Sequence, residues 1–176
     1  MKILVASDLH GSAFYTKKLT ERIAQEKPDK IVLLGDLLYH GPRNDLPEGY
    51  NPKEVIQLLS DLSPAPLCVR GNCEAEVDQM VLPFPVLAEY CVLFLEGKSI
   101  YCTHGHRPTP PLAKGDILLC GHTHVPKAEW RENYLYLNCG SVSIPKENSP
   151  HSYMIIQNGT CVWKDLDAKE FMTFTL

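Results

Sequence analysis

The sequence predicts an α/β fold in which two sheets pack together and helices lie outside them. In the first half, short apolar runs alternate with amphipathic helical segments, which is typical of parallel βαβ units. After Pro85 the pattern changes to short strands separated by turn residues. A chain of 176 residues fits one domain, residues 1–176, and can bury about 70% of its unfolded surface without disulfides or a structural metal.

Periodicity and end signals place the individual elements. Leu19, Ile23 and Ala24 share one helical face, which predicts a helix over residues 15–25 with Ser12 as its cap. Pro52 suits a first helical turn, so a second helix is expected over residues 52–62. Strands are expected at residues 3–6, 31–34, 67–69, 86–95, 99–103, 116–120, 127–131, 134–138, 153–157 and 160–165.

Turn residues organise the second half of the chain. Glu96-Gly97, Glu132-Asn133 and Asn158-Gly159 predict three hairpins. A helix near residues 110–114 is expected to be missing or short. The polar stretch 39–50 is too long for an ordinary connection, so we expect it to overhang a functional site.

Composition narrows the classes of function. A net charge of −4 without a Lys/Arg block argues against general nucleic-acid binding. There is no basic leader and no apolar run of about 18 residues, so a cytoplasmic protein without a membrane segment is expected. The seven cysteines form no CxxC pair, which favours reduced thiols over a structural zinc site. The oligomeric state stays open, a homo-oligomer included.

Five polar clusters come directly after apolar runs, at the expected ends of strands. Ligand sites in open α/β sheets gather at the C-terminal ends of strands. Each cluster alone has an ordinary explanation as a helix cap, a turn or a core histidine, but together they favour a two-metal phosphoesterase site. The clusters are Asp8-Leu9-His10, Gly35-Asp36, Gly71-Asn72, His104-Gly105-His106 and Gly121-His122-Thr123-His124.

The residue types in these clusters suit divalent metals. The two carboxylate oxygens of Asp36 could bridge neighbouring cations, and Asn72 offers a neutral oxygen. His122 and His124 could serve two metals from one loop. Nitrogen and oxygen ligands without thiolate suit Mn²⁺, Fe²⁺, Zn²⁺ or Ni²⁺.

The order D-x-H, G-D, G-N, H-G-H, G-H-x-H resembles the calcineurin-like metallophosphoesterases. The short chain and the segment His40-Gly41-Pro42-Arg43-Asn44 look like the small YfcE-type phosphodiesterases of that family. The resemblance implies a four-layer α/β/β/α sandwich and two metal ions, Mn²⁺ in particular. It also implies a ligand set for each metal: Asp8, His10, Asp36 and His124 for the first, and Asp36, Asn72, His104 and His122 for the second.

The expected reaction is hydrolysis of a small phosphodiester by in-line attack of a hydroxide that bridges the metals. Many family members have a histidine after Gly-Asn, whereas this chain has Cys73. A neutral thiol brings no positive charge, so a monoester dianion would lose a partner and a diester would lose less. A phosphodiesterase is therefore favoured over a phosphomonoesterase.

Several residues have both a functional and an ordinary interpretation. His106 could donate a proton to the leaving group or face solvent, and Arg43 and Asn44 could clamp a phosphate oxygen or belong to a solvated loop. The predicted catalytic residues are Asp36, Asn72 and His106, and the predicted substrate contacts are Arg43, Asn44 and Cys73. An alternative from another class is a protein-interaction scaffold similar to the retromer subunit of the same fold, with weak or no catalysis.

Overall fold

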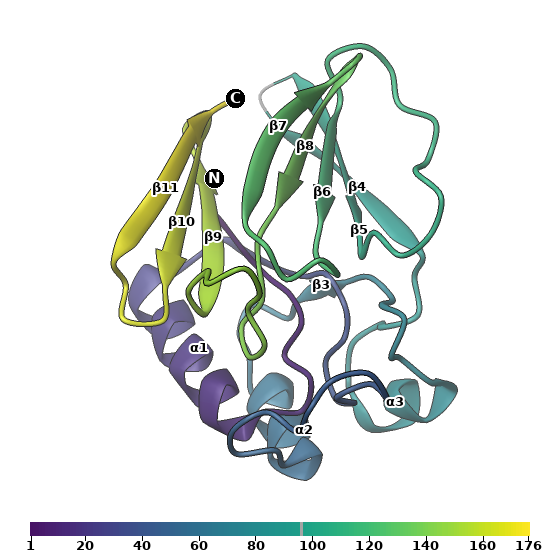
Figure 1. Ribbon diagram of the computed structural model, residues 1–176, viewed down its shortest axis with the longest axis vertical. Helices are drawn as coiled ribbons and strands as arrows, with labels where there is room; N and C mark the ends of the chain where they lie inside the picture. Colours follow the sequence, from purple (N-terminus) through teal and green to yellow (C-terminus); the bar gives the residue numbers. More distant parts are fainter. Residues whose placement is uncertain (96) are drawn as a thin grey trace.

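The computed structural model describes residues 1–95 and 97–176, and these form three helices and eleven strands (Figure 1). Glu96, half of one predicted hairpin turn, lies outside the described residues. The first sheet has the order β11-β10-β9-β1-β2-β3 and the second the order β4-β5-β6-β8-β7. Both sheets combine parallel and antiparallel pairs, such as β1 with β2 and β1 with β9. The predicted α/β class with two mixed sheets is confirmed.

The strand bounds follow the predicted runs closely. The first sheet contains β1 (Ile3–Ala6), β2 (Lys30–Leu33), β3 (Leu67–Cys68), β9 (Ser152–Gln157), β10 (Thr160–Asp165) and β11 (Glu170–Thr175). The second contains β4 (Tyr90–Leu95), β5 (Lys98–Thr103), β6 (Ile117–Cys120), β7 (Lys127–Arg131) and β8 (Tyr134–Asn138). The pairs β4/β5, β7/β8 and β9/β10 are antiparallel, as the three predicted hairpins require.

Two helices begin where the sequence predicts. In α1 (Ala13–Glu26) the hydroxyl of Ser12 accepts a hydrogen bond from the Tyr15 N–H at 3.2 Å, which caps the first turn. In α2 (Pro52–Ser60) the proline occupies the first turn, where its missing N–H costs no helical hydrogen bond. Apolar residues of both helices share one core with β1 and β2, so these helices cover one face of the first sheet.

Alternation along β1 explains how the layers stack. Leu4 and Ala6 point into the core beneath the helices, whereas Ile3 and Val5 join the core between the two sheets. All four side chains are fully buried. A strand that is covered on both faces consists of consecutive apolar residues, so β1 could be predicted from the sequence.

The outer face of the second sheet has a thin cover. Leu118 and Tyr136 pack against Leu112, which lies in the irregular segment between β5 and β6. Within residues 97–176 no helix forms near residues 110–114, as expected. Among the helices that the structure describes, none is long and apolar enough to cross a bilayer.

Three features differ from the predicted elements. The strand predicted from residue 86 begins at Tyr90, because the Val86 N–H donates to the Gln79 side chain instead of to a neighbouring strand. The short helix α3 (Glu76–Val81) and the edge strand β11 were not predicted.

Candidate metal centre

The polar clusters of both sheets converge at one edge of the sandwich. Asp8 follows β1 and Asp36 follows β2 in the first sheet, while His104 follows β5 and His124 follows β6 in the second. These four side chains are almost completely buried. The two sheets therefore contribute to one polar cluster, as the sequence predicts.

Backbone carbonyls fix the orientation of three imidazoles. Nδ1 of His10 lies 2.9 Å from the Tyr39 carbonyl oxygen. Nδ1 of His104 lies 2.6 Å from the carbonyl of Leu34, and Nδ1 of His124 lies 2.5 Å from that of Ile144. A carbonyl oxygen can only accept, so Nδ1 carries a proton in each ring and Nε2 is the ring atom turned toward the cluster.

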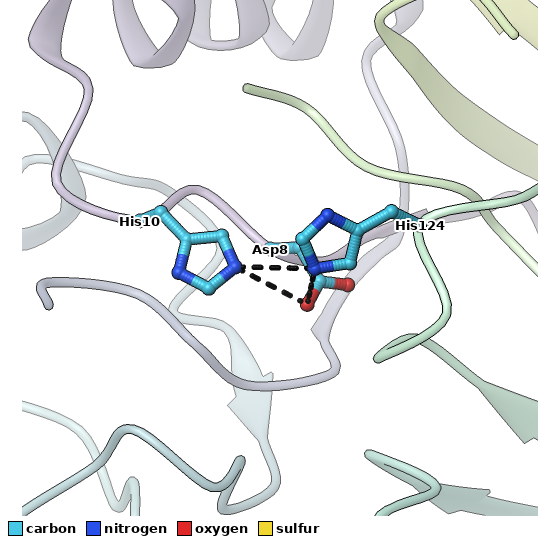
Figure 2. A group of neighbouring side chains, drawn as sticks. All are labelled: Asp8, His10 and His124. Atoms are coloured by element: carbon cyan, nitrogen blue, oxygen red, sulfur yellow. Dashed lines mark hydrogen bonds and ion pairs between the residues drawn. The ribbon is translucent and has the colours of Figure 1, made fainter. Parts of the chain in front are cut away.

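The Nε2 atoms face the carboxylates. Nε2 of His124 lies 3.2 Å from Asp8 Oδ1, and Nε2 of His10 lies 3.6 Å from the same oxygen. Dashed lines in Figure 2 join one oxygen of Asp8 to both rings and join the two rings to each other. Nε2 of His10 and Nε2 of His124 lie 3.3 Å apart. On the other side, Nε2 of His104 lies 3.4 Å from Asp36 Oδ2.

This arrangement fits a divalent cation. Asp8 Oδ1 is buried and has no hydrogen-bond partner among the described residues. Nε2 of His10, Nε2 of His124 and Asp8 Oδ1 converge on one place, and a positive charge among them stabilises that arrangement. The donors are imidazole nitrogen and carboxylate oxygen, a set that Mn²⁺, Fe²⁺, Zn²⁺ and Ni²⁺ share.

Three groups of donor atoms are close enough to hold a metal. The first combines Asp8, His10 and His124, and the second combines Asp8, Asp36 and His104. The third adds the Cys73 thiol to His10 and Asp36. Burial and the neighbouring charge of Asp36 raise the pKa of the Cys73 thiol, so the thiol stays neutral. It therefore lies beside Asp36 as a weak donor rather than as a thiolate.

Asn72 and His122 lie at the rim of the cluster. The side-chain oxygen of Asn72 lies 3.1 Å from Nε2 of His104. The backbone N–H of His122 donates to Asp8 Oδ2 at 3.0 Å, and its ring centroid lies 5.0 Å from that of His104. In the part of the chain that the structure describes, His122 does not belong to the three compact donor groups.

The charges in the cluster stabilise one another. Burial alone would raise the pKa of Asp8, but the imidazoles of His10, His124 and His104 beside its carboxylate outweigh burial and lower that pKa. Burial would lower the pKa of His104, but the hydrogen bond with Asp36 and the charges of both aspartates raise it to about 9. Without a cation, protons take the place of positive charge in the cluster.

The backbone at the cluster is in an uncommon conformation. Five predicted ligand residues have a positive φ: Asp8 (58°), His10 (47°), Asp36 (55°), His122 (66°) and His124 (63°). A non-glycine residue in this region costs about 1 kcal/mol or more, and such residues concentrate at functional sites. The folded scaffold therefore holds these side chains at a cost in local backbone energy.

Glu74 is a supporting residue that the sequence analysis did not single out. Its buried carboxylate accepts hydrogen bonds from the N–H groups of Asp36 at 2.9 Å, Leu37 at 2.7 Å and Gly71 at 2.5 Å. Burial and the charge of Asp36 raise the pKa of Glu74 to about 7, although these N–H groups oppose the rise. A Cβ at position 71 would overlap Asp36 and Glu74, so the Gly-Asn cluster needs this glycine.

An open pocket of about 250 Å³ lies over the cluster. Its lining includes Arg43 and Asn44, so the loop over residues 39–50 reaches the site as expected. Lys146, from the loop after β8, also lines the pocket and was not predicted. A single lysine in a segment between Pro145 and Pro150 matches no binding motif, so the sequence did not indicate it. The complete lining is His10, Asp36, Arg43, Asn44, Asn72, His122, His124 and Lys146.

His106 lies beside the centre instead of in the pocket lining. Its ring centroid is 5.4 Å from that of His104 and 6.1 Å from that of His122. Burial and the charge of His104 lower the pKa of His106. Its predicted role as a proton donor stays a prediction.

Comparison with known proteins agrees with this geometry. The sequence profile of the calcineurin-like phosphoesterase superfamily domain matches residues 1–160. The chain therefore belongs to the calcineurin-like phosphoesterase superfamily, and the grouped Asp and His donors define it as a metal-dependent phosphoesterase.

One relative is similar over most of the chain. Phosphodiesterase YfcE of Escherichia coli K12 is 46% identical over 162 residues, which cover 90% of this chain and 88% of that protein. The solved structure of the E. coli YfcE phosphoesterase superposes with a TM-score of 0.94 at 43% identity, with 99% of each chain covered.

More distant structures share the fold alone. Vacuolar protein sorting 29 from Cryptosporidium parvum has a TM-score of 0.65 at 21% identity, with 99% of this chain and 98% of that chain covered. An archaeal phosphodiesterase has a TM-score of 0.64 at 17% identity over both complete chains. One fold thus carries both a sorting protein and a phosphodiesterase, so the argument for chemistry depends on the site.

Proposed function

We propose that the chain is a phosphodiesterase that uses two divalent metal ions, Mn²⁺ in particular. The observation that carries this proposal is the convergence of the Nε2 atoms of His10 and His124 and the unpartnered Asp8 Oδ1 at the floor of an open pocket. Similarity to phosphodiesterase YfcE supports the diester. When bound, the metals would neutralise phosphate charge and acidify a water molecule so that it attacks phosphorus at neutral pH.

The proposed ligands follow the donor groups. Asp8, His10, Asp36 and His124 would hold one ion, and Asp36, Asn72, His104 and His122 the other. Asp36 Oδ2 lies 3.7 Å from Nε2 of His10 and 3.4 Å from Nε2 of His104, which supports a bridging position between the two sets. The carbonyl partners of the three imidazoles keep each Nε2 directed at the ion.

The pocket residues would position the substrate. Arg43 and Asn44 would contact the phosphate oxygens that the metals leave free, and Asn72 would orient the reacting phosphate. The neutral Cys73 thiol beside Asp36 supplies no positive charge for the second charge of a monoester, which favours the diester. His106 would donate a proton toward the leaving oxygen from beside His104.

The test is hydrolysis of bis-p-nitrophenyl phosphate and of p-nitrophenyl phosphate by chelator-treated protein, before and after Mn²⁺ is restored. We expect Mn²⁺-dependent turnover of the diester and little of the monoester. Elemental analysis of the reloaded protein should give two metal ions per chain, and one ion would contradict the paired site. Parallel titrations with Zn²⁺, Fe²⁺ and Ni²⁺ test the preference for manganese.

Absence of turnover with every divalent metal would overturn the proposal. The interaction-scaffold alternative would then explain the retained fold, as in vacuolar protein sorting 29. Equal turnover of diester and monoester would contradict the part assigned to Cys73 while leaving a metal-dependent phosphoesterase in place.

The cellular setting belongs to the same proposal. We place the protein in the cytoplasm as one domain over residues 1–176 acting on a small substrate, without general nucleic-acid affinity. The seven cysteines are all free and five of them are buried, which suits a reducing compartment. Contributions from both sheets to one site support the single domain.

A further inference from the structure

Two cations line the pocket in addition to the groups that would hold the metals. Arg43 lies in the loop between β2 and α2, and Lys146 lies in the loop between β8 and β9. Within residues 1–95 and 97–176, neither side chain forms an ion pair with a carboxylate, although Asp45 and Glu147 are close in sequence. Both positive charges are therefore available to a ligand.

The loop of Lys146 is anchored to the metal centre. The Lys146 N–H donates to the carbonyl of His124 at 3.3 Å, and the neighbouring Ile144 carbonyl accepts the Nδ1 proton of the same histidine. The hydroxyl of Ser149 donates to the Lys146 carbonyl at 2.6 Å. The lysine backbone therefore has a fixed position relative to His124.

The loop of Arg43 is anchored in a similar way. The Tyr39 carbonyl at its start accepts the Nδ1 proton of His10. The side-chain amide of Asn44 donates to the His40 carbonyl at 2.8 Å, which holds the turn that carries the arginine. Each cation thus lies on a loop hydrogen-bonded to a different proposed metal ligand.

Charge balance indicates what these cations bind. Two divalent ions, the carboxylates of Asp8 and Asp36 and one attacking hydroxide would leave about one net positive charge at the pocket floor, which already balances the single negative charge of a phosphodiester. A simple diester therefore gives Lys146 no anionic partner of its own, and Arg43 would share the reacting phosphate with the metals. Arginine and lysine at a pocket rim contribute most when a phosphate or carboxylate meets them.

We propose that the physiological substrate is a phosphodiester with a second anionic group, such as a terminal phosphate, and that Arg43 and Lys146 bind that group. This inference rests on the proposed phosphodiesterase function. Lys146 would thus help to select the substrate, and Arg43 would bind a second anion in addition to the reacting phosphate.

The test compares three chromogenic diesters at fixed ionic strength. They are thymidine 5′-(4-nitrophenyl phosphate), its 3′-phosphorylated form, and its 3′-O-methyl form as a neutral extension. With Mn²⁺-loaded protein, we expect kcat/KM for the 3′-phosphorylated compound to exceed both others by roughly tenfold, the gain from one or two charge-assisted contacts in a partly exposed site.

Variants then locate the contact. Lys146→Gln and Arg43→Gln should each reduce this preference about threefold, and the double variant should remove it. Lys114→Gln, an exposed lysine outside the pocket lining, is the matched control and should keep the full preference. Metal content and the thermal midpoint, measured in parallel, confirm that each variant is folded and loaded.

The possible failures are distinguishable. Equal kcat/KM for the phosphorylated and methylated compounds, with clear metal-dependent turnover of both, would overturn this inference and leave the phosphodiesterase standing. A preference that persists in the double variant would also overturn it. Lack of metal-dependent turnover of all three compounds would overturn the proposed function and this inference together.

Discussion

The carboxylate of Glu74 holds the backbone of Asp36: Oε2 of Glu74 accepts the Asp36 N–H at 2.9 Å, and Oε1 accepts the N–H of the next residue, Leu37, at 2.7 Å. The proposed bridging ligand thus keeps its left-handed backbone through a side chain that contacts no proposed metal position. Removing Glu74 should therefore affect stability and metal content together.

For Glu74→Ala we expect the free energy of unfolding to fall by about 2 to 4 kcal/mol, because three buried N–H groups lose their acceptor. Glu74→Gln keeps one acceptor oxygen, so its free energy of unfolding should lie between the values of wild type and Glu74→Ala. Denaturant titration measures the loss of stability, and elemental analysis measures the loss of bound metal. A loss below about 0.5 kcal/mol, the usual effect of a neutral surface substitution, would contradict this role.

Asp36→Asn should remove metal-dependent hydrolysis. The amide keeps the shape of the side chain but loses the charge and one acceptor, so a bridge between two cations fails. We expect kcat/KM to fall at least about a hundredfold, together with the metal content per chain. Asp167→Asn, an exposed carboxylate outside the pocket, is the control. Unchanged activity in Asp36→Asn would remove the bridging role.

Cys73→His should raise monoester hydrolysis relative to diester hydrolysis. The imidazole would bring a hydrogen-bond donor, and positive charge when protonated, to the position beside Asp36 that a neutral thiol now occupies. Cys73→Ser, similar in size and neutral, should keep the wild-type ratio. The measurement is the ratio of the two kcat/KM values, and an unchanged ratio in Cys73→His would refute the explanation.

Stability should depend on pH through Glu26, which lies far from the centre. Burial raises the pKa of Glu26, but hydrogen bonds from Lys2 and Lys164 outweigh it and lower that pKa in the folded protein. The stabilisation is therefore present above the unfolded pKa and is lost as the pH falls through the folded pKa. Glu26→Gln should cost about 1 kcal/mol at pH 7 and less as the solution becomes acidic.

Denaturant titrations of wild type and Glu26→Gln at pH 7 and near pH 3 measure this difference. A constant difference between the two pH values would show that the charge of Glu26 contributes nothing. Glu21→Gln, on the exposed face of the same helix, controls for a change in net charge.

The fold and the polar cluster were predictable because their signals are local. Apolar runs such as Ile3–Ala6 end directly at the polar residues, so the order of the clusters already indicated where they meet. The short helix α3 gave no comparable signal, since its N-cap residue is Ala75 and six residues show no clear period. The edge strand β11 lies partly exposed, so its apolar pattern is weak.

The surroundings of the site depended on distant contacts. Lys146 and Arg43 are separated by most of the chain, and only the packed sheets bring their loops to one pocket. Glu74 resembles any acidic residue after a turn until its three N–H partners are seen. The positive φ angles of Asp8 and Asp36 likewise arise from the folded backbone, and residue type alone does not identify them because most aspartates have a negative φ.

The position of β1 between β2 and β9 has a consequence for synthesis on the ribosome. The strand that leads into Asp8 emerges well before one of its two neighbours, Ser152–Gln157. The hydroxyls of Ser141 and Ser143, which hold the Asp8 carbonyl, also arrive late. The Asp8 motif is therefore synthesised before the hydroxyls that hold it, which follow 133 and 135 residues later, and the centre can close only after they have emerged.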